Sequence, residues 1–187
     1  MAPSRHRFLR RKPVKPAGYN LRMSVLTRHT LDFLSRSPEQ TRRVGMRLGG
    51  LIRPGDLVCL QGELGAGKTT LVQGIGAGWG AIDSVSSPTF VLVNQYRRAD
   101  GNQLFHMDAY RIDSAAEGEQ LDLISMLNEG TLIIEWPERL GNILPAERLW
   151  IQLAHVAEET RQLRAESQGE RHDALADGLR HAIFGVN

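Results

Sequence analysis

The residues best suited to chemistry in this sequence form a glycine-rich stretch in its first half. It reads Gly-Glu-Leu-Gly-Ala-Gly-Lys-Thr-Thr over residues 62–70 and fits the P-loop pattern of a glycine, four residues and Gly-Lys-Thr. The glycines let the backbone curl so that successive N–H groups point at phosphate oxygens, and the N-terminus of a following helix adds its positive end. The stretch therefore predicts a site for the phosphates of a nucleotide.

The polar side chains of the P-loop have expected roles. Lys68 would neutralise the β- and γ-phosphates, and Thr69 would offer its hydroxyl to Mg²⁺. A glycine-rich turn that matches by accident is the alternative, but the motif lies between an expected strand and an expected helix, which is the context that a P-loop requires. The residues expected to bind the nucleotide are Gly62, Glu63, Leu64, Gly65, Ala66, Gly67, Lys68, Thr69 and Thr70.

Two carboxylates are candidates for the rest of the site. Glu135 ends the apolar run 131–134, where a Walker-B-type acid would meet the metal ion or its water, and Asp108 follows another strand-like stretch. The alternatives are a solvated strand end for Glu135 and, for Asp108, a turn residue that hydrogen-bonds its own backbone. A nucleotide site in the same sheet favours function for both. His106 is expected to orient a neighbour rather than to catalyse.

The segment 86–90, Ser-Ser-Pro-Thr-Phe, is a polar entry to a strand. P-loop proteins often place a nucleotide-sensing switch at this position, and Thr89 would then reach the metal ion or the γ-phosphate. An ordinary turn before a strand is the alternative. Thr89 therefore joins Lys68 and Asp108 as a candidate catalytic residue.

A sheet and several helices must position these residues. Ser37-Pro38-Glu39-Gln40 offers an N-cap and a proline at the first helical position, which predicts a helix that runs until Pro54-Gly55. A buried strand is expected over 57–60, and a helix over 68–79. Further strands are expected at 90–96, 103–106, 131–135, 149–153 and 162–165, with helices at 115–126 and 170–183. The mixture predicts an α/β fold, a P-loop NTPase-like three-layer sandwich with a mixed central sheet.

Length and charge restrict the possible functions. The 187 residues suit one ordinary domain, assigned to 23–187, and 41% hydrophobic with 24% charged residues is a typical globular balance. Residues 1–22 carry seven Lys and Arg and no acid, so the remainder has 16 basic residues against 21 acidic ones. This acidic body argues against a broad face for DNA or RNA, and any RNA role would be indirect.

The stretch 1–22 has three prolines and no apolar period, so a basic, disordered extension is expected. Its alternatives are a binding tail, an organellar transit peptide, or translated sequence upstream of a start at Met23.

The single cysteine, Cys59, is expected to be a small core residue, which suits a reducing cytoplasm. No stretch is apolar enough to span a membrane or to form a secretory signal, so a soluble, cytoplasmic protein is expected.

Four motifs in series resemble those of the TsaE family. They are the P-loop, Ser-Pro-Thr-Phe at 87–90, His-Met-Asp-Ala-Tyr-Arg at 106–111 and Ile-Glu-Trp-Pro-Glu at 134–138, and the resemblance runs from Met23 to the C-terminus. The family comprises bacterial ATPases required to make the threonylcarbamoyladenosine of tRNAs. The resemblance implies a small P-loop fold, ATP and Mg²⁺ as cofactors, hydrolysis stimulated on a complex of the TsaD and TsaB proteins, tRNA contact only through that complex, and a cytoplasmic setting.

The resemblance also implies that Thr69 and Glu135 hold magnesium, with Asp108 near the catalytic water and Thr89 in a switch-like segment. From the residues alone, either Asp108 or Glu135 can orient that water.

Three other functions stay open. A small-molecule or nucleoside kinase would need an arginine-rich lid, and none is evident; a nucleotide-gated assembly factor overlaps with the family's function; a direct RNA-binding protein is disfavoured by the acidic body.

Overall fold

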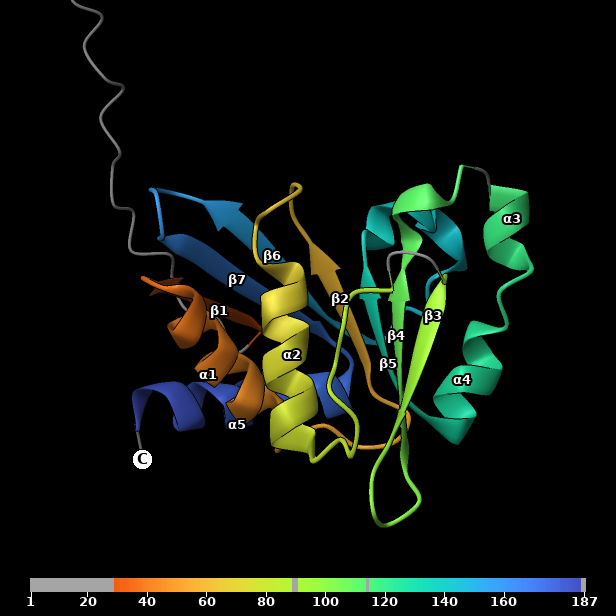
Figure 1. Ribbon diagram of the computed structural model, residues 1–187, viewed down its shortest axis with the longest axis horizontal. Coiled ribbons are helices and arrows are strands. Elements are labelled where there is room, and N and C mark those ends of the chain that lie inside the picture. Colours follow the sequence, from red (N-terminus) through yellow and green to blue (C-terminus); the bar gives the residue numbers. More distant parts are fainter. Residues whose placement is uncertain (1–28, 89–90, 114, 186–187) are drawn as a thin grey trace, which may run out of the picture.

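A seven-stranded sheet forms the centre of the computed structural model, which describes residues 29–88, 91–113 and 115–185 (Figure 1). Its strands are β1 (Thr30–Ser35), β2 (Leu57–Gln61), β3 (Val93–Arg97), β4 (Gln103–Asp108), β5 (Gly130–Glu135), β6 (Arg148–His155) and β7 (Arg161–Gln168). Their order in the sheet is β1-β7-β6-β2-β5-β4-β3. The four neighbours β6, β2, β5 and β4 run parallel, whereas β1, β7 and β3 pair antiparallel with their neighbours.

Helices cover both faces of this sheet. On one face lie α1 (Pro38–Gly49), α2 (Lys68–Trp79) and α5 (Glu170–Phe184); on the other lie α3 (Ala115–Glu119) and α4 (Leu123–Glu129) (Figure 1). Short 3-10 turns at Ala109–Arg111, Pro137–Arg139 and Gly141–Ile143 complete the second layer. The predicted three-layer α/β sandwich with a mixed sheet is confirmed.

Strand β2 runs through the centre of the sheet and is buried on both faces. Val58 and Leu60 belong to the core under α1, α2 and α5, whereas Leu57 and Cys59 belong to the core on the opposite face. A parallel strand covered on both faces needs a continuous apolar run, which explains the sequence of β2. Burial raises the pKa of the Cys59 thiol to about 12, so the prediction that this residue packs in the core is confirmed.

Glycines line the contact between α1 and α2. Cβ atoms added at Gly45, Gly49, Gly74 or Gly78 would each lie 1.9 to 2.3 Å from a carbonyl oxygen of the facing helix. Only glycine therefore permits this approach of the two backbones. The contact holds α2, whose first turn follows the P-loop, firmly against α1.

The start of α1 is as predicted, and its end is not. The Ser37 side chain caps the helix by accepting a hydrogen bond from Gln40 N at 3.2 Å. The helix was expected to reach Pro54 but ends at Gly49, where the N–H of Gly50 bonds to Met46 O and the chain turns toward β2. Gly50 keeps a right-handed backbone, with φ −71° and ψ −10°, so a left-handed glycine cap is not what ends this helix.

Three other elements differ from expectation. Strand β1 was not predicted; Leu31 and Phe33 alternate with Thr30 and Asp32 as in a half-buried strand, but the exposed Leu34 interrupts the pattern. The helix expected over 115–126 is divided into α3 and α4, because the Asp122 side chain caps Ser125 N and starts a new helix. Strand β3 begins at Val93, which pairs with Met107 of β4, whereas residues 91 and 92 form a bend; the expected start at residue 90 lies outside the described residues.

The expected helix at 170–183 is confirmed as α5, with Leu175 and Leu179 buried. The basic stretch 1–22 lies outside the described residues. Among the helices of residues 29–88, 91–113 and 115–185, none has the length and apolar character needed to cross a membrane.

Candidate functional site

The P-loop, Asp108 and Glu135 meet at one edge of the sheet. Asp108 of β4 pairs in register with Glu135 of β5, and Glu135 pairs with Leu60 of β2, two residues before the P-loop. Neighbouring parallel strands bring their carboxyl ends to the same edge, where α/β proteins place their ligands. The separate candidates of the sequence therefore form one site.

The backbone of the P-loop depends on glycine. Gly65 and Gly67 have φ of 77° and 101°, in the region that other residues rarely adopt, and a Cβ at Gly62 would lie 2.5 Å from Leu153 O. Gly67 is also the N-cap of α2 and supplies no side-chain cap. The N–H groups of the first turn of α2 are therefore available to an anion at the positive end of the helix.

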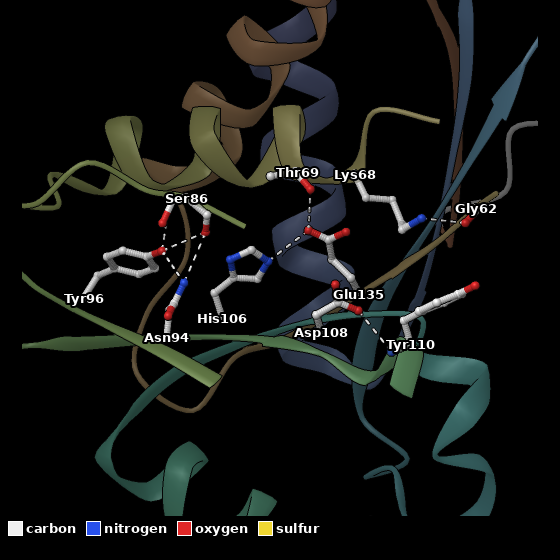
Figure 2. A network of polar contacts seen from close by, with 10 residues as sticks. All are labelled: Gly62, Lys68, Thr69, Ser86, Asn94, Tyr96, His106, Asp108, Tyr110 and Glu135. Carbon is white, nitrogen blue, oxygen red and sulfur yellow. Dashed lines mark hydrogen bonds and ion pairs between the residues drawn. The ribbon is translucent and has the colours of Figure 1, made fainter. Parts of the chain in front are cut away.

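Lys68 folds back over the P-loop. Its Nζ donates to Gly62 O at 2.6 Å (Figure 2). The same Nζ donates to Glu63 O at 3.0 Å and lies 3.8 Å from the centre of the Trp136 ring. Burial lowers the pKa of Lys68, and the nearby carboxylates of Glu135, Asp108 and Glu138 oppose that shift. The ammonium is therefore held beside the place that phosphates would take, by contacts that a phosphate can replace.

Trp136 has an uncommon backbone. With φ 59° and ψ 46°, it is the one non-glycine residue of the described chain at positive φ. Such a conformation carries strain in a bulky residue and is found most often at functional sites. It directs the indole ring over Lys68 and toward Tyr110, whose ring centre lies 5.0 Å away. Trp136 also packs against the hydrophobic core on the face of the sheet opposite α2, so its ring contacts both that core and the site.

Glu135 is a buried carboxylate, which contradicts a solvated strand end. Its side chain is 4% exposed, and its Oε1 accepts a hydrogen bond from the Thr69 hydroxyl at 3.0 Å. The Nε2 of His106 lies 3.0 Å from the same oxygen (Figure 2). Because an ionised carboxylate only accepts, we assign the proton to Nε2 of His106. His106 thus orients a neighbour, as expected.

Thr69 and Glu135 fit a magnesium ion by the chemistry of their donors. A hydroxyl and a carboxylate oxygen are ligands that Mg²⁺ accepts, and the ion usually takes its remaining ligands from phosphates and water. Within the described residues, no group of three or more His, Cys, Asp or Glu side chains could hold a metal ion. An ion held here would therefore depend on the nucleotide for part of its coordination.

Asp108 has two roles in the structure: it caps a turn, and it lines the site. Its Oδ1 accepts from Tyr110 N at 3.0 Å and caps the 3-10 turn that follows β4, so the turn interpretation is confirmed. Asp108 also lines a cavity of about 250 Å³ beside the P-loop. The cavity is lined by Leu64, Gly65, Gly67, Lys68, Thr69, Thr70, Ser87, Asp108, Glu135 and Trp136.

Comparison with known proteins agrees with this geometry. The sequence model of the family "Threonylcarbamoyl adenosine biosynthesis protein TsaE" matches residues 35–163, more than half of the chain. The chain belongs to the TsaE family. The matched range includes the P-loop, Asp108 and Glu135.

Curated TsaE proteins resemble the chain over most of their length. It is 42% identical to the tRNA threonylcarbamoyladenosine biosynthesis protein TsaE of Streptomyces coelicolor, over 70% of this chain and 92% of that protein. It is 35% identical to the protein of the same name from Bacillus subtilis, over 80% of this chain and 93% of that one. Among solved structures, Bacillus subtilis YdiB matches with a TM-score of 0.68 at 28% identity, covering 82% of this chain and 95% of YdiB.

Some residues at the site of this TsaE-family chain were found from the structure and not from the sequence. Ser87 reaches the cavity, although the sequence singled out Thr89, which lies outside the described residues. Trp136 and Tyr110 belong to motifs that were recognised, but the tilted contact between their rings was not expected. A large aromatic residue next to a strand-end acid was the available signal for Trp136.

Proposed function

We propose that this TsaE-family protein is a magnesium-dependent P-loop ATPase required for the threonylcarbamoyladenosine modification of tRNA. It acts as an ATP-driven accessory factor on a complex of TsaD and TsaB. One observation carries the ATPase part of the proposal: the P-loop, Lys68, Thr69, Asp108 and Glu135 surround a single cavity at the carboxyl edge of the sheet. The curated relatives carry the name of the tRNA modification.

In this proposal the P-loop holds the triphosphate. The N–H groups at the start of α2 and the ammonium of Lys68 bind phosphate oxygens, and Lys68 gives up the carbonyls of Gly62 and Glu63 as it does so. Mg²⁺ would supply charge neutralisation at the β- and γ-phosphates. Thr69 and Glu135 would hold it, with the Thr69 hydroxyl turning from Glu135 to the ion.

Asp108 and Glu135 are the two carboxylates among the described residues that line the cavity, and in this proposal either could accept a proton from the attacking water. His106 holds Oε1 of Glu135, and Tyr110 N holds Oδ1 of Asp108, so each carboxylate has one oxygen fixed by the protein. Fixed carboxylates cost little reorganisation when charge develops in the transition state. We assign the attacking water to Asp108, because Glu135 would be engaged by His106 and by the metal ion that it helps to hold.

The partners belong to the same proposal. TsaD and TsaB would stimulate hydrolysis, and tRNA would be met only through their complex, because residues 23–187 carry more acidic than basic side chains. A cytoplasmic location is also proposed, and the free, buried thiol of Cys59 needs no oxidising compartment.

The test is ATP hydrolysis with magnesium by the purified protein, alone and with TsaD and TsaB. We expect stimulation by the partners, its loss together with weakened nucleotide binding in Lys68→Ala, and retained binding without turnover in Asp108→Ala. The loss in Asp108→Ala should be about 10²-fold or more if this group orients the water. Phosphate transfer to a small acceptor, without stimulation by the partners, would instead identify a kinase.

A further inference from the structure

Two side chains of β3 hold one residue of the segment that leads to the nucleotide cavity. The hydroxyl of Tyr96 accepts from Ser86 N at 3.1 Å and donates to Ser86 O at 3.0 Å. The amide Nδ2 of Asn94 donates to Ser86 O at 3.3 Å and to the Tyr96 hydroxyl at 3.2 Å (Figure 2). Both backbone polar groups of Ser86 are thus bound by side chains.

These contacts come from a rigid support. Tyr96 is 5% exposed and packs in the core under α2, so its hydroxyl has a fixed position. Val85, the residue before Ser86, packs closely against α2. A Cβ atom added at Gly76 of that helix would lie 2.2 Å from a methyl carbon of Val85. Pro88 is buried as well. The segment 85–88 is therefore fixed both to α2 and to β3, although Ser86 itself is exposed.

The fixed residue is the immediate neighbour of the site. Ser87 lines the cavity together with Thr69, Asp108 and Glu135. Since one peptide unit joins Ser86 to Ser87, the contacts of Ser86 determine where Ser87 meets the cavity. A displacement of about 1 Å at a reacting centre can cost about 10²-fold in rate.

We propose that Tyr96 and Asn94 are positioning residues that hold Ser86 and Ser87 at the place required for hydrolysis of the γ-phosphate. This inference rests on the proposed ATPase function. The P-loop binds the other phosphates through its own amides and Lys68, which neither Tyr96 nor Asn94 touches in the described structure. Loss of either side chain should therefore reduce turnover and spare the affinity for ADP.

The experiment compares wild type with Tyr96→Phe, Asn94→Leu and the double variant, with TsaD and TsaB present. Tyr96→Phe removes one hydroxyl and keeps the buried ring. Gln95→Ala is the matched control, because Gln95 lies between the two on β3, is exposed, and contacts Gln103 instead of Ser86. We measure kcat and KM for Mg-ATP, and by calorimetry the Kd of Mg-ADP.

We expect kcat to fall about ten-fold or more in Tyr96→Phe and in Asn94→Leu, with the Kd of Mg-ADP within about two-fold of wild type. The double variant should fall little further than the worse single variant, since both side chains act on the same peptide. Gln95→Ala should match wild type. A wild-type kcat in Tyr96→Phe would overturn this inference and leave the proposed ATPase function intact. A loss of ADP affinity as large as the loss of kcat would also overturn it, because that result indicates general structural damage. A wild-type protein that hydrolyses no ATP would overturn the proposed function, and this inference with it.

Discussion

At the scale of single residues, two hydrogen bonds reach one oxygen of Glu135, from the Thr69 hydroxyl and from Nε2 of His106. A magnesium ion bound by Thr69 would draw its hydroxyl away from Glu135. His106 would then be the remaining protein partner of that oxygen. Hydrogen bonds of this kind orient metal ligands and raise their affinity for the ion.

We therefore predict that His106→Leu raises the magnesium concentration needed for half-maximal ATP hydrolysis by about 10- to 100-fold. Nucleotide binding without magnesium should change little, because the amides of the P-loop are untouched. A magnesium titration of hydrolysis, with calorimetry of ADP in EDTA, measures both. His181→Leu, at an exposed position of α5, is the control. An unchanged magnesium requirement would show that Glu135 is oriented without His106.

The sequence predicts this site unevenly, for a physical reason. The P-loop is contiguous, and its glycines and Lys68 carry their function in local order, so it is recognised directly. The contact of His106 with Glu135 spans 29 residues and depends on strand register, which the sequence alone leaves open. The left-handed backbone of Trp136 is also set by its surroundings, since nothing local favours it in a tryptophan.

At the scale of elements, the contact of α1 with α2 permits a sharp test. Gly74→Ala would place a methyl group 2.1 Å from Arg42 O, so the helices must separate. We predict a loss of about 1–3 kcal/mol in the free energy of unfolding, measured with urea. Gly50→Ala is the control, because its Cβ would lie 3.7 Å from the nearest atom and its φ is −71°. That variant should be neutral or more stable by about 0.4–1 kcal/mol. Equal stability of the two variants would contradict the close packing.

Elements were predictable where the pattern is strong and local. The N-cap at Ser37 predicts the first residue of α1 correctly, and the apolar run at 57–60 predicts the first residue of β2 correctly. Strand β1 was missed because it has only six residues, whose alternation is broken by the adjacent Phe33 and Leu34, and because its pairing partner, β7, lies more than 100 residues later. The break between α3 and α4 depends on whether Asp122 acts as a cap or as a helix residue, and helical periodicity does not decide that.

At the scale of the whole molecule, α5 is hydrogen-bonded to the start of β2, the strand that leads to the P-loop. Arg171 of α5 donates to both carboxylate oxygens of Asp56 at 2.9 and 2.6 Å. The next residue, His172, accepts a hydrogen bond from Leu57 N at 3.2 Å through Nε2. Its accepting Nε2 carries no proton, so the folded protein requires the neutral imidazole here. Two distant parts of the chain are thereby joined by one titratable side chain.

This contact makes stability depend on pH. Burial lowers the pKa of His172; the carboxylates of Asp56, Glu147 and Asp173 oppose the shift, and Arg171 adds to it. Since the folded pKa lies below the unfolded value of about 6.5, this stabilisation is complete above that value and is lost as pH falls through the folded pKa. We predict that the free energy of unfolding in urea falls between pH 7.5 and pH 5, and that His172→Gln, whose amide oxygen can accept from Leu57 N, reduces this fall. Each pKa unit removed corresponds to about 1.4 kcal/mol. His181→Gln, on the exposed part of α5, should keep the wild-type dependence; if it and His172→Gln behave alike, the pH dependence arises elsewhere.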